Sequence, residues 1–125
     1  MTNLAPNTKY YVKAYATNIT GTVYGDQVDF TTGKSIVITT QTASNITENS
    51  ATGNANILEL GETSPTQHGI CWNTTGNPTS ADNKTELGAV SSTGAFSSSI
   101  TGLSAYTIYY ARAYAIDSKG TTYGN

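Results

Sequence analysis

Residues 103–124 read LSAYTIYYARAYAIDSKGTTYG, and residues 4–25 read LAPNTKYYVKAYATNITGTVYG. The two stretches align without a gap at an offset of ninety-nine residues. Identical residues occupy the paired positions Leu4/Leu103, Thr8/Thr107, Tyr10/Tyr109, Tyr11/Tyr110, Ala14/Ala113, Tyr15/Tyr114, Ala16/Ala115, Gly21/Gly120, Thr22/Thr121, Tyr24/Tyr123 and Gly25/Gly124. Such self-similarity indicates a tandem architecture, and it says more about the fold than about an activity.

Within the first copy, side chains alternate with the period of two that a β-strand requires. Between residues 8 and 17, Tyr10, Val12 and Ala14 fall on one face. Residues 18–22, NITGT, have turn chemistry, and residues 24–32 predict a second strand with Val28 and Phe30 on one face. The sequence therefore predicts an N-terminal β-hairpin with a connection of about five residues.

The remainder of the chain also predicts short strands separated by turn signals. Expected strands cover residues 35–40, 50–57, 66–72, 94–100 and 107–117, with one short edge strand within residues 84–90. No segment shows an apolar stripe of helical period. Roughly seven short strands with Gly, Pro and Asn between them are typical of an all-β sandwich. The core is expected to contain Ile36, Ile38, Ala51, Ile70, Trp72, Phe96, Ile100, Leu103, Tyr109, and Tyr114 or its opposite-face neighbours.

Composition narrows the range of partners. The formal net charge is −2, and only 11% of residues are charged, with no basic run, so no nucleic-acid partner is expected. The apolar stretches fall far short of the ~20 residues of a membrane span, so no membrane insertion is expected. Cys71 is the only cysteine, which excludes an intrachain disulfide.

The pattern Leu-x-Pro-x-Thr-x-Tyr-x-Val-x-Ala at residues 4–14, and its looser form at residues 103–113, resembles the segment leading into the sixth strand of fibronectin type III domains. The similarity extends over residues 50–52, 68–72, 77–82, 96–103 and 112–124. Together these stretches look like the fibronectin-type tandem repeats of bacterial surface and secreted proteins. The second copy departs from the pattern, with Ala105 in place of Pro and Ala111 in place of Val.

This resemblance implies a fibronectin type III-like β-sandwich and a specific division of the chain. Residues 34–125 would supply strands A to F of one domain that lacks its last strand, and residues 1–33 would supply the F–G hairpin of a preceding repeat. The resemblance also implies that Tyr10 and Tyr109 form tyrosine corners, in which the hydroxyl bonds back to the main chain. Any export signal is expected to lie upstream of Met1.

A sandwich without its last strand leaves the edge of residues 107–117 unpaired, and such an edge invites another strand. To pair with this edge in its own domain, the strand of residues 26–32 would have to be carried back along the sandwich by the two linker residues 33–34. A strand of seven residues spans roughly 23 Å, whereas two linker residues reach at most about 7 Å. Residues 26–32 are therefore expected to pair with another copy, giving a homo-oligomer by strand exchange, as a reciprocal dimer or an open filament. The alternative is a monomer in which residues 1–33 pack loosely. The expected exchange interface consists of Asp26, Val28, Phe30, Thr107, Tyr109, Ala111 and Ala113.

Few side chains suggest chemistry. His68 and Cys71 fall on opposite faces of one strand, so they predict neither a metal site nor an activated nucleophile. Asp82, Asn83 and Glu86 match no calcium-loop spacing, and calcium binding is left open. We therefore expect no catalytic residue, no cofactor and no metal site.

The tyrosines suggest a candidate ligand surface. Tyr11 with Tyr15, and Tyr110 with Tyr114, form same-face pairs on which sugar rings could stack. The leading expectation, which the resemblance implies, is a non-catalytic structural spacer or adhesion and protein-interaction module of an exported bacterial protein, outside the cell or on its surface. The alternative is a carbohydrate-binding module appended to a polysaccharide-active enzyme, with a glycan rather than a protein as ligand.

Overall fold

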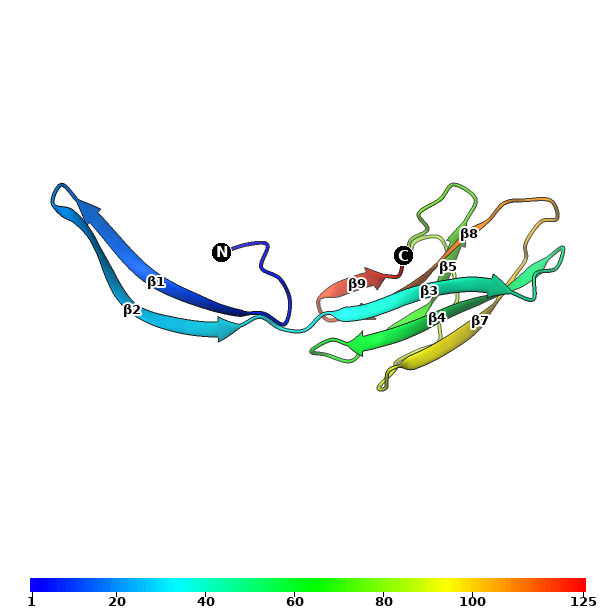
Figure 1. Cartoon of the computed structure of the whole chain (residues 1–125). Helices are drawn as coiled ribbons and strands as arrows, with labels where there is room; N and C mark the ends of the chain where they lie inside the picture. Colours follow the sequence, from blue (N-terminus) through cyan, green and yellow to red (C-terminus); the bar gives the residue numbers. More distant parts are fainter. The chain divides into compact units, whose positions relative to one another are not determined.

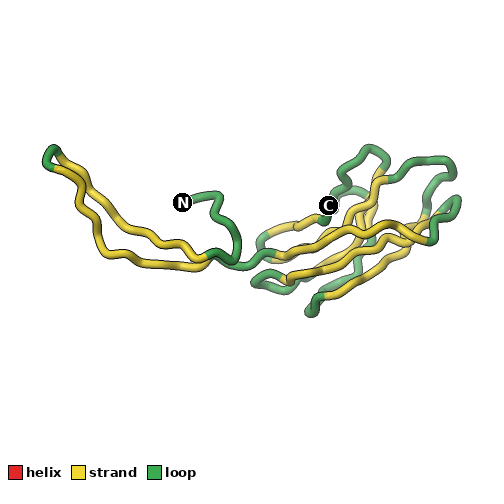
Figure 2. The backbone as a smooth tube through the Cα atoms, in the orientation of Figure 1, coloured by secondary structure: helices red, strands yellow, loops and turns green.

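The computed structural model describes all 125 residues, and they form antiparallel strands joined by loops, with no helix (Figures 1 and 2). The chain divides into two compact units, residues 1–35 and residues 36–125. The first unit contains β1 (Lys9–Asn18) and β2 (Gly21–Thr31). The second contains β3 (Ile36–Ser44), β4 (Ser50–Leu60), β5 (Gln67–Asn73), β6 (Asn83–Lys84), β7 (Gly94–Thr101), β8 (Tyr110–Asp117) and β9 (Gly120–Tyr123).

The first unit is a β-hairpin whose turn is tighter than the sequence suggests. Asn18 pairs with Gly21, so the connection is two residues long and not about five. The Asn18 Oδ1 atom accepts hydrogen bonds from the Thr20 N–H at 2.9 Å and from the Thr20 hydroxyl at 2.6 Å. Gly21 has φ of 143°, a conformation that a side chain would oppose. These local bonds make the shorter turn possible.

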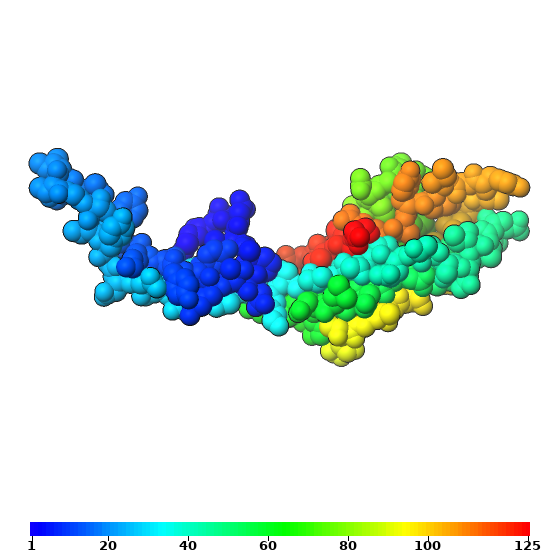
Figure 3. Space-filling view, in the orientation of Figure 1, coloured from blue at the N-terminus to red at the C-terminus, as the bar shows by residue number.

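The hairpin exposes side chains on both faces. On one face Tyr10 stacks on Phe30 at 5.9 Å between ring centroids, and Val12 lies opposite Val28. On the other face the Lys9 ammonium lies 3.1 Å from the Asp29 carboxylate. The hairpin is a two-stranded sheet of β1 and β2 alone, and it is drawn in blue in Figure 3. Because a hairpin alone has no second layer, Val28 remains 62% exposed.

The second unit is a two-sheet, sandwich-like fold. One sheet has the order β3-β4-β7 and the other the order β6-β5-β8-β9 (Figure 1). From Ser50 to Ile57 in β4, half-buried and buried residues alternate, as expected for a strand with one face on a core. The core between the sheets contains Ile36, Ile38, Ala51, Ala55, Ile57, Ile70, Trp72, Ile100, Ala113 and Ala115.

Most of the expected core residues are buried between the two sheets, and Phe96, Leu103 and Tyr109 pack partly buried against that core. Tyr114 is fully buried but lies outside the core cluster. It pairs with Gly69 of the neighbouring strand β5, and its hydroxyl donates a hydrogen bond to the Thr85 carbonyl at 2.7 Å. The loop after β6 therefore gives the second sheet a covered outer face at this point.

Two strands are longer than their apolar patterns indicate. β3 continues to Ser44 and β4 to Leu60, with register shifts between Val37 and Ile38 and between Gln41 and Ser44. The Asn54 amide donates to the Thr42 carbonyl at 2.9 Å and to the Ser44 hydroxyl at 3.0 Å. Side-chain hydrogen bonds thus extend the strand pairing into residues whose composition resembles a loop.

Residues 114–117 do not form the unpaired edge expected from the sequence, because β9 pairs with them. The turn before β9 repeats the turn of the hairpin: the Asp117 Oδ1 atom accepts from the Lys119 N–H at 2.8 Å, and Gly120 has φ of 133°. The pairs Tyr114–Tyr123 and Tyr15–Tyr24 stand at the same position of the two repeats. No helix in the structure is long and apolar enough to span a membrane.

Candidate functional site

The strand β8 is paired unequally along its two edges. On one side, β8 pairs with β5 from Tyr110 to Ile116. On the other side β9 pairs only with residues 114–117, and the Gly124 N–H donates to the Ala113 carbonyl at 2.9 Å. Residues 110–112 have no strand partner on this side. The second edge of β8 is therefore open over its first three residues.

A shallow hollow of about 260 Å³ follows this open edge. Its lining consists of Asn77, Pro78, Tyr110, Ala111, Arg112 and Asn125. The Arg112 side chain is turned toward β9, since its Nε atom donates to the Gly124 carbonyl at 2.6 Å and its guanidinium lies 4.7 Å from the centre of the Tyr123 ring.

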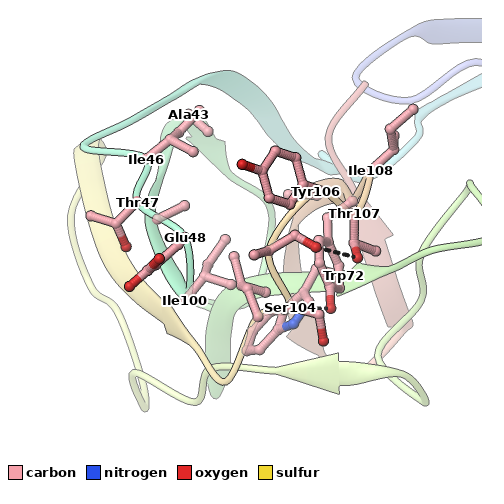
Figure 4. Close-up of a pocket in the computed structure, with 15 residues that line it drawn as sticks. Ala43, Ile46, Thr47, Glu48, Trp72, Ile100, Ser104, Tyr106, Thr107 and Ile108 are labelled. Atoms are coloured by element: carbon pink, nitrogen blue, oxygen red, sulfur yellow. Dashed lines mark hydrogen bonds between the residues drawn. The ribbon is translucent and has the colours of Figure 1, made fainter.

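A larger and mainly apolar cavity of about 410 Å³ opens beside the same stretch. Trp72 and Ile100 are buried and form its floor, whereas Ile46, Tyr106 and Ile108 are exposed and form its rim. Figure 4 shows the Tyr106 ring between Ile46 on one side and Thr107 on the other. The remaining lining comes from Ala43, Thr47, Glu48, Ala51, Leu103, Ser104, Ala105, Thr107, Tyr109 and Ala111. The cavity thus exposes part of the sandwich interior to solvent.

The segment before β8 is shaped by the same local bonds in both repeats. The Ser104 N–H donates to the Tyr109 hydroxyl at 3.2 Å, and the Ala5 N–H donates to the Tyr10 hydroxyl at 2.9 Å. Both tyrosines therefore bond back to the main chain five residues upstream. Between Ser104 and Tyr109, Tyr106 adopts φ of 55° and its side chain is fully exposed.

The residues expected to form an exchange interface occupy two different units. Asp26 and Val28 are exposed on β2, and Phe30 is half-buried under Tyr10. In the second unit, Thr107 and Tyr109 lie before β8, and the Thr107 hydroxyl donates to the Ala105 carbonyl at 3.2 Å (dashed in Figure 4).

Ala111 and Ala113 lie on β8 itself, the first half-buried and the second fully buried. Tyr109 and Ala111 line the large cavity, and Ala113 belongs to the core. The structure therefore brings the expected acceptor residues together along one strand and the cavity beside it.

His68 and Cys71 point to opposite sides of β5 and each has a partner. The His68 Nδ1 atom lies 2.8 Å from the Gly88 carbonyl oxygen, and its ring packs edge-on against Phe96 at 4.7 Å. The Cys71 thiol donates to the Arg112 carbonyl at 3.3 Å. Burial raises the pKa of this thiol to about 11, so little thiolate forms near neutral pH.

The acidic residues considered for calcium are engaged with their neighbours. The Asp82 carboxylate accepts from the Thr79 N–H at 2.8 Å and from the Thr79 hydroxyl at 3.2 Å, and this backbone bond lowers the pKa of Asp82. Glu86 forms an ion pair with Lys84 at 3.1 Å. No group of three or more His, Cys, Asp or Glu side chains lies together in a way that could hold a metal ion.

The tyrosines differ in their availability to a ligand. Tyr114 is fully buried, so the pairing of Tyr110 with Tyr114 as a stacking surface is wrong. Tyr11, Tyr15 and Tyr24 are all exposed on the hairpin, and the ring centroids of Tyr15 and Tyr24 lie 6.4 Å apart. The exposed aromatic surface therefore lies mainly on the hairpin.

The rim of the large cavity is the part of the site that the sequence alone does not single out. Ile46 lies in a loop segment, where periodicity gives no information. Ile108 falls within the strand expected over residues 107–117, but β8 begins only at Tyr110. One signal does exist: Tyr106 occupies the repeat position at which the first copy has Asn7. An aromatic residue where its repeat has a turn residue marks the position as unusual.

The sequence matches no known family model, and no curated protein sequence matches it.

Proposed function

We propose that this chain is a non-catalytic module of an exported bacterial protein, built from tandem fibronectin type III-like repeats. It acts as a structural spacer or as an adhesion and protein-interaction element at the cell surface or outside the cell. It also associates with further copies of itself by strand exchange. The resemblance in sequence supports the export and the surface location.

The main support is the structural equivalence of the two repeats. Four pairs of residues in the β8–β9 ladder have counterparts at the same offset in the β1–β2 ladder. The bonds to the Tyr10 and Tyr109 hydroxyls and the two-residue turns recur as well. A chain that carries the same hairpin twice fits a tandem array in which each repeat has the same role.

The sheet orders support the finer assignment of the fold. If β3, β4 and β7 are strands A, B and E, then β6, β5, β8 and β9 take the order C′-C-F-G of an immunoglobulin-like sandwich. In this assignment β1 and β2 are strands F and G of a preceding repeat. The contacts of His68 and Cys71 described above suit packing roles, which supports a non-catalytic module.

Static light scattering of the full chain across a range of concentrations tests the self-association. The expected result is a mass that rises from monomer to dimer or a larger assembly as concentration increases. A chain that remains monomeric up to millimolar concentration would contradict this part of the proposal, and the spacer role would then stand alone.

A second candidate function, carbohydrate binding, rests on the exposed rings of Tyr15 and Tyr24 on one face of the hairpin. Aromatic faces exposed in this way can stack on sugar rings. A glycan array probed with the full chain tests it, with Tyr15→Ala and Tyr24→Ala expected to lose any signal. Tyr106→Ala is the matched control, because that exposed ring lies in the other unit. Signal that survives all three changes would contradict stacking at this face.

A further inference from the structure

We propose that the free edge of β7 binds the same edge of a second copy of this chain, so that the two β3-β4-β7 sheets join into one. The two β7 strands run antiparallel and are related by a two-fold axis at Ser98. This contact lies within the second unit, where β3 packs against β8 and β9 and β7 packs against β5. It is therefore on the side of the sandwich away from β9, and it does not depend on the strand exchange proposed above.

The outer edge of β7 has no hydrogen-bonded partner. β7 is the outermost strand of its sheet (Figure 1), and all eight of its residues, Gly94 to Thr101, pair with β4 on the inner side. No hydrogen bond in the structure joins residues 94–101 to any segment other than β4. The N–H and C=O groups on the outer side are therefore available to an added strand.

The two edges of this sheet differ in how they are protected. Proteins usually guard an edge strand with a bulge, a Pro, a charge or a covering segment. The pairing of β3 has two register shifts, and its Thr40 hydroxyl accepts a hydrogen bond from the Ala113 N–H of β8 at 3.1 Å. The pairing of β7 is regular throughout, and the chain has neither a Pro nor a charged residue between Glu86 and Arg112. β7 thus lacks the sequence features that keep an edge from pairing.

The sequence of β7 is self-complementary, which identifies a second copy as the partner. Phe96 and Ile100 stand two positions on either side of Ser98, and these three side chains are on the inner, less exposed face. Ser97 and Ser99 are on the exposed face. An antiparallel pair centred on Ser98 places Phe96 of one copy opposite Ile100 of the other. It also places Ser97 opposite Ser99. A shift of one residue would set inner side chains against outer ones, so the period of two favours this register.

Phe96 is the side chain that gains most from the contact. It is half-buried, and its ring packs edge-on against His68 at 4.7 Å between centroids. Side chains directly opposite in an antiparallel pair interact, so Ile100 of the second copy would cover the Phe96 surface that water now reaches. One pair of strands buries less than the roughly 1,600 Å² of a standard interface. We therefore expect a weak dimer that forms at high protein concentration.

Disulfide trapping in the full chain tests the register. Ser98→Cys would lie opposite itself across the axis, whereas Ser97→Cys would lie opposite Ser99. Two Cys residues whose Cα atoms are more than about 7 Å apart cannot be bridged, and the two Ser97 positions would be two residues out of register. We expect at least about tenfold more covalent dimer on a non-reducing gel for Ser98→Cys than for Ser97→Cys. The native Cys71 is buried and should not compete. Equal yields, including no dimer from either variant, would overturn the register.

Charge substitution at the two exposed serines tests the contact without disturbing the core. One variant carries Ser97→Lys and Ser99→Lys, and a second carries Ser97→Glu and Ser99→Glu. In the centred register each places like charges directly opposite, which is destabilising. By light scattering, each variant alone should be monomeric at concentrations where the original chain is dimeric, and an equal mixture of the two should associate. The matched control, Ser97→Lys with Ser99→Glu, places opposite charges face to face and should associate at least as well as the original chain.

The outcomes separate this contact from strand exchange. If the original chain associates and both like-charge variants associate equally well alone, the β7 contact is overturned, although strand exchange stands. If the like-charge variants are monomeric both alone and when mixed, the antiparallel register centred on Ser98 is overturned. If the original chain is monomeric up to millimolar concentration, both the β7 contact and strand exchange fail. Association of the mixture and of the control, but of neither like-charge variant alone, supports the β7 contact.

Discussion

Tyr106 and Asn7, ninety-nine residues apart, hold the same left-handed backbone conformation, with φ of 55° and 49°. Each lies between a tyrosine and the residue five positions upstream whose N–H donates a hydrogen bond to the tyrosine hydroxyl. Asn tolerates this region because its short side chain bonds locally, whereas Tyr gains nothing there to offset the strain. The second repeat therefore carries strain that the first repeat avoids, on a fully exposed side chain at the rim of the cavity.

This strain predicts that Tyr106→Asn stabilises the second unit by up to about 1 kcal/mol. Tyr106→Ala removes the same ring without improving the backbone, so it serves as the control. Urea unfolding of the full chain, monitored by Trp72 fluorescence, measures both. Equal midpoints for the Asn and Ala variants would show that the left-handed conformation is not the source of the strain.

Each hydrogen bond to a tyrosine hydroxyl should contribute to the stability of the unit in which it lies. Tyr109→Phe deletes the bond to the Ser104 N–H and should destabilise the second unit by about 1 kcal/mol, the usual net value of one hydrogen bond. Tyr10→Phe deletes the equivalent bond in the hairpin and should leave the unfolding midpoint reported by Trp72 unchanged. A loss of stability in the second variant as large as in the first would contradict the division into two units.

Gly69 should tolerate no side chain. A Cβ atom at this position would overlap the Thr85 carbonyl, which also accepts the bond from the Tyr114 hydroxyl. Gly69→Ala must therefore displace the loop after β6, and we expect a loss of about 2–3 kcal/mol, in the range of overpacked cores. In Gly25→Ala the new Cβ would meet only Ala14 at 3.7 Å, so this control should change stability little. Chemical denaturation compares the two, and similar losses would count against the contact with Thr85.

Alkaline pH should destabilise the second unit in two steps. Burial raises the pKa of Cys71 from 9.0 to about 11, and burial also raises the pKa of Tyr114 from 10.0 to about 12. Above pH 9 the unfolded thiol loses its proton while the folded thiol keeps it, so the folded state binds more protons and stability falls as pH rises. The Tyr114 phenol adds a second decline in stability above pH 10 for the same reason.

Urea midpoints measured at each pH from 8 to 11 check this behaviour, with Cys71→Ala as the matched variant. The variant should keep a constant midpoint to about pH 10, the ordinary pKa of the remaining phenol, whereas the original chain should begin to weaken near pH 9. Identical pH profiles for the two proteins would mean that the thiol does not contribute.

Local pattern was sufficient for the strands and for most of the core. Alternation of apolar residues marks Ala51, Ala55 and Ile57 on one face of β4, because the side chains of a strand point alternately to its two faces. Pattern was insufficient at strand ends. The continuation of β3 to Ser44 depends on hydrogen bonds from Asn54, a residue ten positions away in the sequence.

The internal repeat carried information that single positions did not. It relates the hairpin to β8 and β9, and it marks Tyr106 against Asn7 by residue order alone. It did not reveal that β9 would form, since residues 120–123 become a strand only when the Asp117 turn places them beside β8. Nor could it show that Tyr114 is buried, because the loop that covers it comes from residues 85–88.

The sequence by itself determined that this chain is an all-β protein with a repeated segment, because both the period of two and the repeat are properties of residue order. Only the tertiary structure decided which part of β8 is open and where the apolar cavity lies. Both features depend on how far β9 extends and on which side chains from β3, β5 and β7 meet beside residues 105–111. Contacts between residues distant in the chain are set by packing, which no local pattern encodes.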